Sequence, residues 1–221
     1  MKTIIAVISY FLIAQSAFTQ NNCNRTTNFG QAEICIPILD GMQECYLEPT
    51  IKMLADATEV STNVVLAYYL DQSTYDQLDN IYNIHYDNYL KIYATKELQD
   101  IEMGISEVEE MNKVLADNFI ITEWDDIKKE VDGLNLDIEI GQPTVVKNYT
   151  HNDKSFTYVM LVNYVLDTET NYTMAMTVNG MLLNKRLIWM AYYLNYDGED
   201  SIELLQSKSN AILDNIIRAN K

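Results

Sequence analysis

Residues 172–194 read YTMAMTVNGMLLNKRLIWMAYYL, two apolar runs joined by Asn184 and Lys185. In the first run, Met174 and Met176 alternate with smaller or more polar residues. A period of two is typical of a β-strand that buries one face. Two strands with a two-residue connection pair antiparallel. The segment therefore predicts a β-hairpin with Asn184 and Lys185 in its tight turn.

Two more β-rich runs lie upstream of this hairpin, at residues 144–149 and 156–166. Short polar breaks separate each run from the next, and such spacing favours antiparallel pairing of neighbours. The sequence therefore predicts a C-terminal meander of four strands. Four shorter runs in the N-terminal half are also expected to be strands. They are residues 32–38, 42–47, 63–70 and 89–93.

Three segments have the apolar spacing of amphipathic helices. Val108, Met111 and Leu115 repeat at steps of three and four residues, as one face of a helix requires. The segments are residues 106–119, 122–133 and 201–219. An open sheet needs such helices to cover its faces. We therefore expect an α+β fold, an antiparallel sheet with a C-terminal meander covered by amphipathic helices in an αβα sandwich.

The order of these segments resembles the PsbP-like fold, which is named for an extrinsic subunit of photosystem II. Ala32-Glu33-Ile34-Cys35-Ile36-Pro37 resembles its opening strand. Residues 186–194 and the helix at 201–219 resemble its last strand and closing helix. The resemblance covers residues 32–220 and lies in the order of the elements. It implies a binding or assembly protein without catalysis, and it assigns no functional residue.

The first 19 residues are expected to be a secretory signal peptide. Lys2 precedes an apolar run at residues 4–14, and a polar segment follows, which is the order of regions in a signal peptide. Cleavage after Ser16 and cleavage after Thr19 both fit the need for small residues. An uncleaved N-terminal anchor is the alternative, although a membrane-spanning helix needs about 20 apolar residues.

The mature chain is expected to be secreted or periplasmic, without a transmembrane segment. A tail at residues 20–31 and one α+β domain at residues 32–221 are expected, because no linker or repeat divides the rest of the chain. The formal net charge is −17, from 32 acidic and 15 basic residues. Nucleic acids and anionic membranes attract basic surfaces, so neither is an expected partner.

Three cysteines bear on the compartment: Cys23, Cys35 and Cys45. If residues 39–41 form a three-residue loop with Gly41 in the left-handed conformation, Cys35 faces Cys45 across a hairpin. A disulfide between Cys35 and Cys45 is therefore a candidate in an oxidising compartment, and two buried free thiols are the alternative. Cys23 is left over in the tail, with no base nearby to make it a nucleophile.

The sequence contains none of the motifs that bind nucleotides or metals or that build a nucleophilic site. The adjacent pairs Glu109-Glu110 and Asp125-Asp126 point in different directions on a helix, so they indicate solvated faces rather than an acid–base pair. His85 and His151 are expected to be structural or surface residues. No cofactor, metal ligand or catalytic residue is therefore assigned.

Sixteen tyrosines are the most unusual positive feature of the composition. An aromatic face can bind a carbohydrate, a peptide or a protein partner. The candidate binding residues are Tyr68, Tyr89, Tyr93 and Tyr192. The alternative is that these tyrosines are ordinary strand residues in a chain that is also rich in Ile and Asn.

We therefore predict an exported non-enzymatic domain that binds a protein partner or a small ligand, through one face of its sheet or a groove beside it. A secreted or periplasmic carboxylate-dependent hydrolase is the alternative, and it predicts two carboxylates facing one concave pocket. A divalent-cation-binding protein that exploits the acidic charge is the third hypothesis. Sequons at Asn24, Asn148 and Asn171 would carry glycans only in a host with N-glycosylation.

Overall fold

The computed structural model describes residues 23–78, 86–118, 139–165 and 171–221. The predicted signal peptide, the helix expected at residues 122–133, His85 and the Asp125-Asp126 pair lie outside these ranges. Within the described ranges, no helix is both long enough and apolar enough to cross a membrane.

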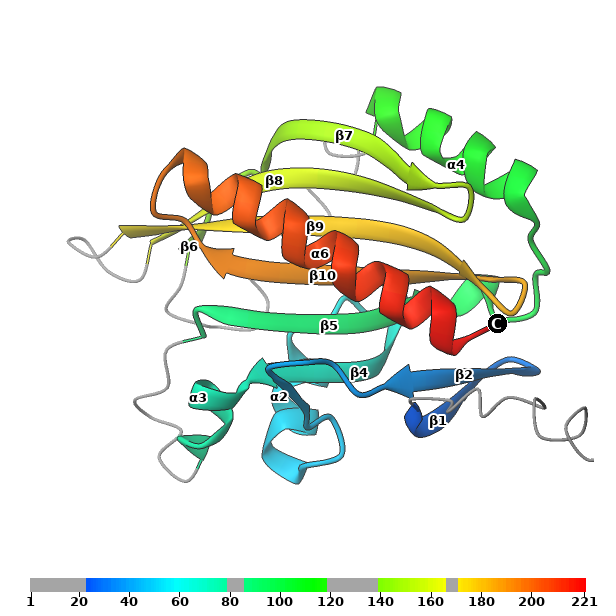
Figure 1. Cartoon of the computed structure of the whole chain (residues 1–221), viewed down its shortest axis with the longest axis horizontal. Helices are drawn as coiled ribbons and strands as arrows, with labels where there is room; N and C mark the ends of the chain where they lie inside the picture. Colours follow the sequence, from blue (N-terminus) through cyan, green and yellow to red (C-terminus); the bar gives the residue numbers. More distant parts are fainter. Residues whose placement is uncertain (1–22, 79–85, 119–138, 166–170) are drawn as a thin grey trace, which may run out of the picture.

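One antiparallel sheet organises the described residues (Figure 1). Its strands lie in the order β3-β4-β5-β10-β9-β8, and β6 and β7 both pair with the remaining edge of β8. The predicted α+β class and the C-terminal meander from β7 to β10 are confirmed. The strands are β3 (Met42–Glu44), β4 (Asn63–Asp71), β5 (Asn88–Thr95), β6 (Glu139–Ile140), β7 (Thr144–Asn152), β8 (Ser155–Val165), β9 (Asn171–Leu183) and β10 (Arg186–Asn195).

Asn184 and Lys185 form the predicted tight turn between β9 and β10. Leu183 pairs with Arg186 directly across it. Both turn residues have positive φ, 46° and 64°, as a type I′ turn requires. This turn type matches the right-handed twist of the two strands that it joins, so the hairpin follows from local chemistry.

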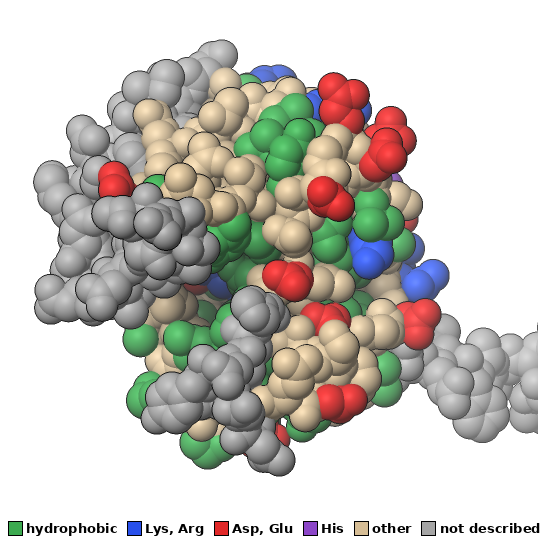
Figure 2. Space-filling model, turned by 90° about the vertical axis from the view of Figure 1, so that its left-hand side faces the viewer, with side chains coloured by type: hydrophobic (Ala, Val, Ile, Leu, Met, Phe, Trp, Pro, Cys, Tyr) green, Lys and Arg blue, Asp and Glu red, His purple; other side chains and the backbone are tan. Residues whose placement is uncertain are grey.

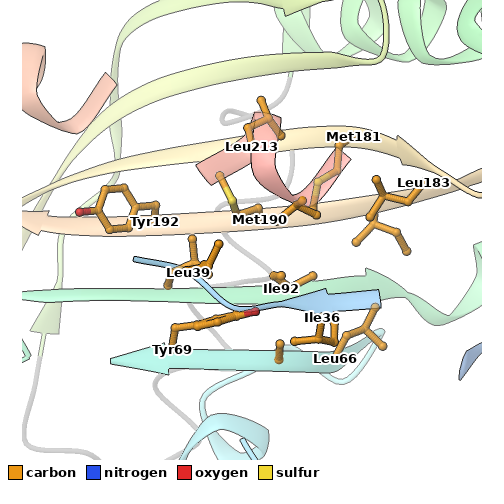
Figure 3. Packing of buried hydrophobic residues seen from close by; sticks show 14 of the residues in the cluster. Ile36, Leu39, Leu66, Tyr69, Ile92, Met181, Leu183, Met190, Tyr192 and Leu213 are labelled. Atoms are coloured by element: carbon orange, nitrogen blue, oxygen red, sulfur yellow. The ribbon is translucent and has the colours of Figure 1, made fainter. Parts of the chain in front are cut away.

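Helix α6 (Glu199–Ala219) lies across one face of the sheet, which we call the α6 face (Figure 1). Leu205 and Leu213 are completely buried and pack with the apolar side chains of the central strands. Figure 3 shows this cluster, in which Leu213 lies beside Met181 and Met190. Burying one large apolar side chain contributes about 1.5–3 kcal/mol, so this cluster supplies much of the stability of the fold.

Helix α4 (Ile105–Asn118) covers part of the opposite face, which we call the α4 face. Val108 is buried in a cluster with Tyr158, whose hydroxyl donates to the backbone oxygen of Asn112 at 3.1 Å. Helix α2 (Pro49–Ala57) packs against β4. Helices therefore lie on both faces of the sheet, and the predicted αβα sandwich is confirmed. The other described helices are short: α3 (Gln72–Tyr75) and η2 (Lys96–Leu98).

Strand β2 (Ala32–Pro37) pairs with β1 (Cys23–Phe29) in a separate two-stranded sheet. Its predicted hairpin with residues 42–47 is therefore wrong, because β3 pairs with β4 instead. Ile34 and Ile36 are completely buried and belong to the cluster under α6. Burial of these two side chains on the α6 face explains why β2 lies over the sheet and not beside β3.

Strand β1 occupies part of the segment expected to be an N-terminal tail at residues 20–31, which corrects that expectation. The Arg25 guanidinium anchors β1 to the main sheet, donating to Glu44 at 2.9 Å and to the backbone oxygen of Leu66 at 2.7 Å. The backbone N–H of Cys35 donates to Asn220 Oδ1 at 2.8 Å, and Asn220 Nδ2 donates to the carbonyl of Cys35 at 2.9 Å. The C-terminal end of α6 thus completes the hydrogen bonding of β2.

The disulfide joins Cys23 to Cys35, whose Cα atoms lie 5.5 Å apart. The predicted bridge between Cys35 and Cys45 is therefore wrong. The reason is the pairing of β1 with β2, which brings Cys23 beside Cys35, whereas Cys45 follows β3 on the main sheet. Cys45 is a buried free thiol.

Digestion of the folded, non-reduced protein is expected to release Cys23 and Cys35 in one linked peptide pair. Cys45 is buried, and its thiol has a pKa raised to about 12. Burial is the largest cause of this increase, and the nearby Glu44 carboxylate is the second. The thiolate is the reactive form, so we expect Cys45 to resist alkylation at about pH 8 until the protein unfolds. Mass spectrometry after alkylation with and without denaturant measures both results, and rapid labelling of Cys45 in the folded protein would contradict the second.

Candidate functional site

The predicted binding tyrosines lie on two different faces of the sheet. Tyr68, Tyr89 and Tyr93 belong to the clusters of the α4 face. Tyr192 belongs to the cluster under α6 and is 1% exposed. Neighbouring residues of a strand point to opposite faces, so Tyr193 and not Tyr192 joins the other three. The structure therefore corrects the predicted set at Tyr192, which is a core residue.

A stack of rings crosses three neighbouring strands of the α4 face. The ring centroids of Tyr68 and Tyr89 are 5.8 Å apart, and those of Tyr89 and Tyr193 are 4.3 Å apart. Tyr93 stacks separately on Trp189, with centroids 6.5 Å apart. Tyr68 and Tyr193 are only 6% and 9% exposed. The stack is therefore part of the packing of the sheet and presents little surface to a ligand.

Burial keeps the phenols of this stack neutral. It is the largest cause that raises the pKa of Tyr68, Tyr89 and Tyr193, and neighbouring phenols raise these pKa values further. A phenolate in the stack would be a buried charge, which is costly unless it is paired. The chemistry of the stack is that of packing and not of proton transfer.

A concave feature lies at one end of the sheet, where β8 ends, β9 begins and β10 ends. Its volume is about 470 Å³, which is within the usual range for small-ligand pockets. Figure 2 views the molecule from this end and shows Asp and Glu side chains spread over the surface rather than gathered in one patch. We call this feature the sheet-end hollow. Its lining residues are Asn163, Tyr164, Val165, Asn171, Tyr172, Thr173, Asn195 and Tyr196.

Cross-strand pairing sets the positions of these side chains. Tyr164 pairs with Tyr172, and Asn163 pairs with Thr173. Directly opposite residues project to the same face, so the rings of Tyr164 and Tyr172 stack with centroids 5.0 Å apart and planes 11° apart. The Thr173 hydroxyl donates to Asn163 Oδ1 at 2.8 Å. Neighbouring residues of a strand project to opposite faces, so the ring pair lies on the α4 face and the amide–hydroxyl pair on the α6 face at the strand ends that border the hollow.

The segment at the end of β10 forms another side of the hollow. The backbone N–H of Tyr196 donates to the carbonyl of Thr173 at 3.0 Å. The backbone N–H of Asn195 donates to the carbonyl of Asp87 at 2.8 Å. These bonds hold Asn195 and Tyr196 between β9 and the residue that precedes β5, so this side of the hollow is also fixed by the backbone.

The described lining side chains are uncharged, and all of them except Val165 can form hydrogen bonds. The pKa of Tyr164 is raised to about 12, mainly by burial and to a smaller extent by the neighbouring Tyr172. The pKa of Tyr172 is also raised, mainly by burial and to a smaller extent by the Asp87 carboxylate. Both phenols therefore stay protonated at neutral pH and can donate, while the amides of Asn163 and Asn195 can both donate and accept. The hollow combines aromatic rings with uncharged hydrogen-bonding groups.

The described lining of the hollow includes no acidic or histidine residue, although the Asp87 carboxylate lies near enough to Tyr172 to raise the pKa of its phenol. Within residues 23–78, 86–118, 139–165 and 171–221, no three His, Cys, Asp or Glu side chains form a group that could hold a metal ion. His151 contacts Asp214 of α6 at 3.0 Å. Glu109 and Glu110 are exposed on α4.

Sequence reasoning misses Tyr164 and Tyr172, the aromatic pair of the hollow. The period of two could place each of them on the same face as the buried residues of its own strand. Their stacking depends on the register of β8 against β9, which pairs Tyr164 with Tyr172. The register is a long-range property that neither strand specifies alone.

No family model matches the chain, and no curated protein matches it. Similar solved structures include a solution structure of cyanobacterial PsbP (CyanoP) from Synechocystis sp. PCC 6803, with 12% identity, a TM-score of 0.35, and coverage of 90% of this chain and 86% of that chain. They also include a mutant of the protein Mog1, with 12% identity, a TM-score of 0.31, and coverage of 88% and 87%. The Ran-binding protein Mog1p of Saccharomyces cerevisiae has 13% identity, a TM-score of 0.27, and coverage of 88% and 87%. The first of these bears the name of the fold family that the sequence resembles.

Proposed function

We propose that the protein is an exported, non-catalytic domain that binds a partner molecule in the sheet-end hollow. The observation that carries the proposal is the concave volume at the strand ends, whose described lining includes the stacked pair of Tyr164 and Tyr172 and three asparagine residues. Aromatic rings supply contact area and amides supply directional hydrogen bonds, and a pocket with both holds a ligand in one orientation. Helices α6 and α4 pack on the two faces of the sheet, so the hollow at its end is the favoured binding place.

The chemistry of the lining favours binding over hydrolysis. A carboxylate-dependent hydrolase needs two carboxylates that face one pocket, and one of them must act as an acid near neutral pH. Among the residues that the structure describes, the eight that line the hollow supply amide, hydroxyl, phenol and aliphatic groups. For Asp71, burial alone would raise the pKa of the carboxyl group. Hydrogen bonds from Ser73 and Thr74 outweigh burial, so the pKa is lowered. A lowered pKa suits the helix cap that Asp71 forms at α3 and does not suit a general acid.

Export is supported by two independent features. Residues 1–19 have the order of charged, apolar and polar regions of a signal peptide. The disulfide between Cys23 and Cys35 is of a kind that persists in oxidising compartments. We therefore assign the mature chain to a secreted or periplasmic location as part of the same proposal.

Capture from the native extracellular or envelope fraction tests the proposed function. Wild-type protein is expected to retain one component at a constant ratio, and Tyr172→Ala is expected to retain about tenfold less, because it removes one ring of the stacked pair. The matched control is Leu204→Ala, since Leu204 is also a large exposed side chain but lies on α6 outside the hollow. Circular dichroism verifies that both variants are folded. Equal capture by the two variants, or nothing retained by the wild type, would contradict the proposal.

A further inference from the structure

We infer that the sheet-end hollow binds a primary alkylammonium group, carried either by a free amine or by a lysine side chain of a partner protein. The inference rests on the proposed function, because it names the chemistry of the molecule that the same hollow binds. The α4 side of the hollow combines aromatic rings with a carboxylate, and the chain holds two of its own lysine ammonium groups in the same combination.

Four neighbouring strands position the groups on the α4 side of the hollow. Tyr164 of β8 pairs with Tyr172 of β9, and Tyr164 belongs to the cluster of the α4 face. Asn195 of β10 pairs with Met174, a member of the same cluster. Asp87 directly precedes β5, and its carbonyl accepts from the backbone N–H of Asn195 at 2.8 Å. Directly opposite residues project to the same face, so the ring pair and the Asn195 amide lie on one side of the sheet.

The Asp87 carboxylate lies beside the ring pair. Asp87 comes two residues before Tyr89, which belongs to the cluster of the α4 face, and alternation along the chain places both side chains on that face. The pKa of the Tyr172 phenol is raised mainly by burial and to a smaller extent by the Asp87 carboxylate, which therefore lies near it. Asp87 is exposed, and within the described ranges it forms no ion pair with a Lys or Arg side chain.

Lys52 shows how this chain holds an ammonium group between a ring and a carboxylate. Its Nζ lies 4.6 Å from the centroid of the Tyr46 ring, donates to the Tyr46 hydroxyl at 2.8 Å and forms an ion pair with Asp56. The ring attracts the cation through its quadrupole, and the carboxylate attracts it through its charge. The two attractions act together on one ammonium group.

Lys91 repeats this arrangement on the α4 face. Its Nζ lies 5.2 Å from the centroid of the Tyr93 ring and 2.6 Å from Oε2 of Glu59. In the part of the chain that the structure describes, no Lys or Arg side chain lies over the ring of Tyr164 or Tyr172. The hollow therefore has the ring and the carboxylate of the other two arrangements, and a second molecule supplies the cation.

The charge around the hollow has the sign that a cation requires. Residues 166–170, which connect β8 to β9 in the sequence, contain Asp167 and Glu169 but no Lys or Arg. The whole chain has a formal net charge of −17, so its long-range field attracts cations. A divalent metal ion prefers several oxygen ligands, and no group of metal-binding side chains is found among the described residues. A monovalent organic cation fits these conditions better than a metal ion.

The size of the hollow and its amide fit an alkylammonium ligand. The volume of about 470 Å³ holds an alkyl chain as well as its ammonium group. Tyr172 is 36% exposed, so its ring offers a surface on which the alkyl chain can pack. An ammonium group donates three hydrogen bonds and accepts none, and the Asn195 carboxamide oxygen is an acceptor beside the Asp87 carboxylate.

Titration of the full chain with matched small molecules tests the inference. The probes are 1,5-diaminopentane, the uncharged 1,5-pentanediol of the same length, and the anion glutarate. Calorimetry measures the affinity, and saturation-transfer NMR detects the contact. We expect saturable binding of the diamine that weakens by about tenfold as sodium chloride rises from about 20 mM to about 500 mM. The diol and glutarate are expected to bind at least about tenfold more weakly than the diamine.

The variants locate the binding in the hollow. Asp87→Asn and Tyr172→Ala are each expected to weaken the diamine affinity by about tenfold, whereas Tyr172→Phe keeps the ring and most of the affinity. Glu33→Gln is the matched control for Asp87→Asn, because it also removes one exposed negative charge. The Glu33 carbonyl accepts from Asn184 at the opposite end of β9 from the hollow. Circular dichroism verifies that all four variants are folded.

The compound Nα-acetyl-lysine methylamide distinguishes the two sources of the ammonium group. It carries a lysine side chain between two peptide bonds, as a partner protein does. Binding at least as tight as that of the diamine indicates a lysine of a partner. Binding about tenfold weaker than that of the diamine indicates a free amine.

Three results would overturn the inference: no saturable binding of either amine, binding of the diol as tight as that of the diamine, or amine binding that Asp87→Asn weakens no more than Glu33→Gln does. If these results occur while capture from the native fraction still depends on Tyr172, the ammonium class is wrong and the proposed function stands. If that capture also fails, both are wrong.

Discussion

Above about pH 10, the protein is expected to unfold in one steep transition as its buried tyrosines lose their protons. Tyr68, Tyr69, Tyr192 and Tyr193 are each buried, with exposed fractions between 0% and 9%. The pKa values of all four phenols are raised well above the ordinary value for tyrosine, and burial is the largest cause in each case. Two lie on the α6 face and two on the α4 face, so both halves of the core contribute to the transition.

Proton linkage sets the direction of this effect. Above about pH 10 the unfolded chain has released these protons, whereas the folded state still holds them. Stability is therefore fully present below about pH 10 and is lost as the pH rises toward the folded-state pKa values. Four such groups lower the free energy of unfolding by about 5 kcal/mol per pH unit in that window. Since domain stability is typically about 5–15 kcal/mol, one to three pH units are enough to unfold the protein.

A titration that follows phenolate absorbance and far-UV circular dichroism together tests this expectation. Exposed tyrosines should titrate gradually, and the buried ones should titrate in the same step in which the circular dichroism is lost. Tyr193→Phe should reduce the pH dependence of the unfolding free energy by about 1.4 kcal/mol per pH unit, because it removes one titrating group. Titration of all 16 tyrosines near pH 10 with unchanged circular dichroism would refute the linkage argument.

Replacing Asn179 by alanine is expected to lower the free energy of unfolding by about 3 kcal/mol or more. Asn179 is completely buried on β9. Its Oδ1 accepts from the Thr157 hydroxyl at 2.7 Å, and its Nδ2 donates to the carbonyl of Met190 at 3.1 Å. Thr177 and Ser209 join the same network, with distances to the Asn179 amide of 3.1 and 3.4 Å.

The size of the effect follows from the groups that the variant leaves behind. Without the amide, the Thr157 hydroxyl loses this acceptor and the Met190 carbonyl loses this donor inside the core. Each buried polar group left unpaired costs about 1–3 kcal/mol. The network also connects β8, β9 and β10 to α6 through Ser209, so its loss weakens the packing of that helix on the sheet.

Asn163→Ala is the matched control for Asn179→Ala. Asn163 also forms a cross-strand pair with a threonine, whose hydroxyl donates to its Oδ1 at 2.8 Å, but this hydrogen bond is exposed. Water can replace it, so we expect a loss below about 1 kcal/mol. Urea unfolding of both variants measures the difference. Equal losses at the two positions would show that burial of the Asn179 network does not carry the effect.

The meander from β7 to β10 could be predicted from the sequence because its signals are local. The period of two identifies each strand, and Asn184 and Lys185 supply a turn with two positive φ values. The apolar stripe of α6 is likewise visible within one segment, and a helix with such a stripe must bury it against a sheet. The α+β class and the sandwich follow from these elements.

The partners of β2 could not be predicted in the same way. The segment Ala32–Pro37 has the same pattern whether it pairs with the strand before it or the strand after it. The outcome depends on burial of Ile34 and Ile36 under α6 and on hydrogen bonds to Asn220, which is 185 residues away from Cys35. The disulfide depends on this pairing, so the error in the strand partner caused the error in the cysteine partner.

The sequence by itself determined the fold class, the order of the meander strands and the abundance of tyrosine and asparagine from which the hollow is built. Only the tertiary structure decided that Tyr192 is a core residue, that Tyr164 stacks on Tyr172 and that Cys23 is the partner of Cys35. The physical reason is that side-chain period and turn propensity are properties of one segment. Register and strand partner are set by contacts between distant segments, and a slip of one residue moves every side chain of a strand to the opposite face.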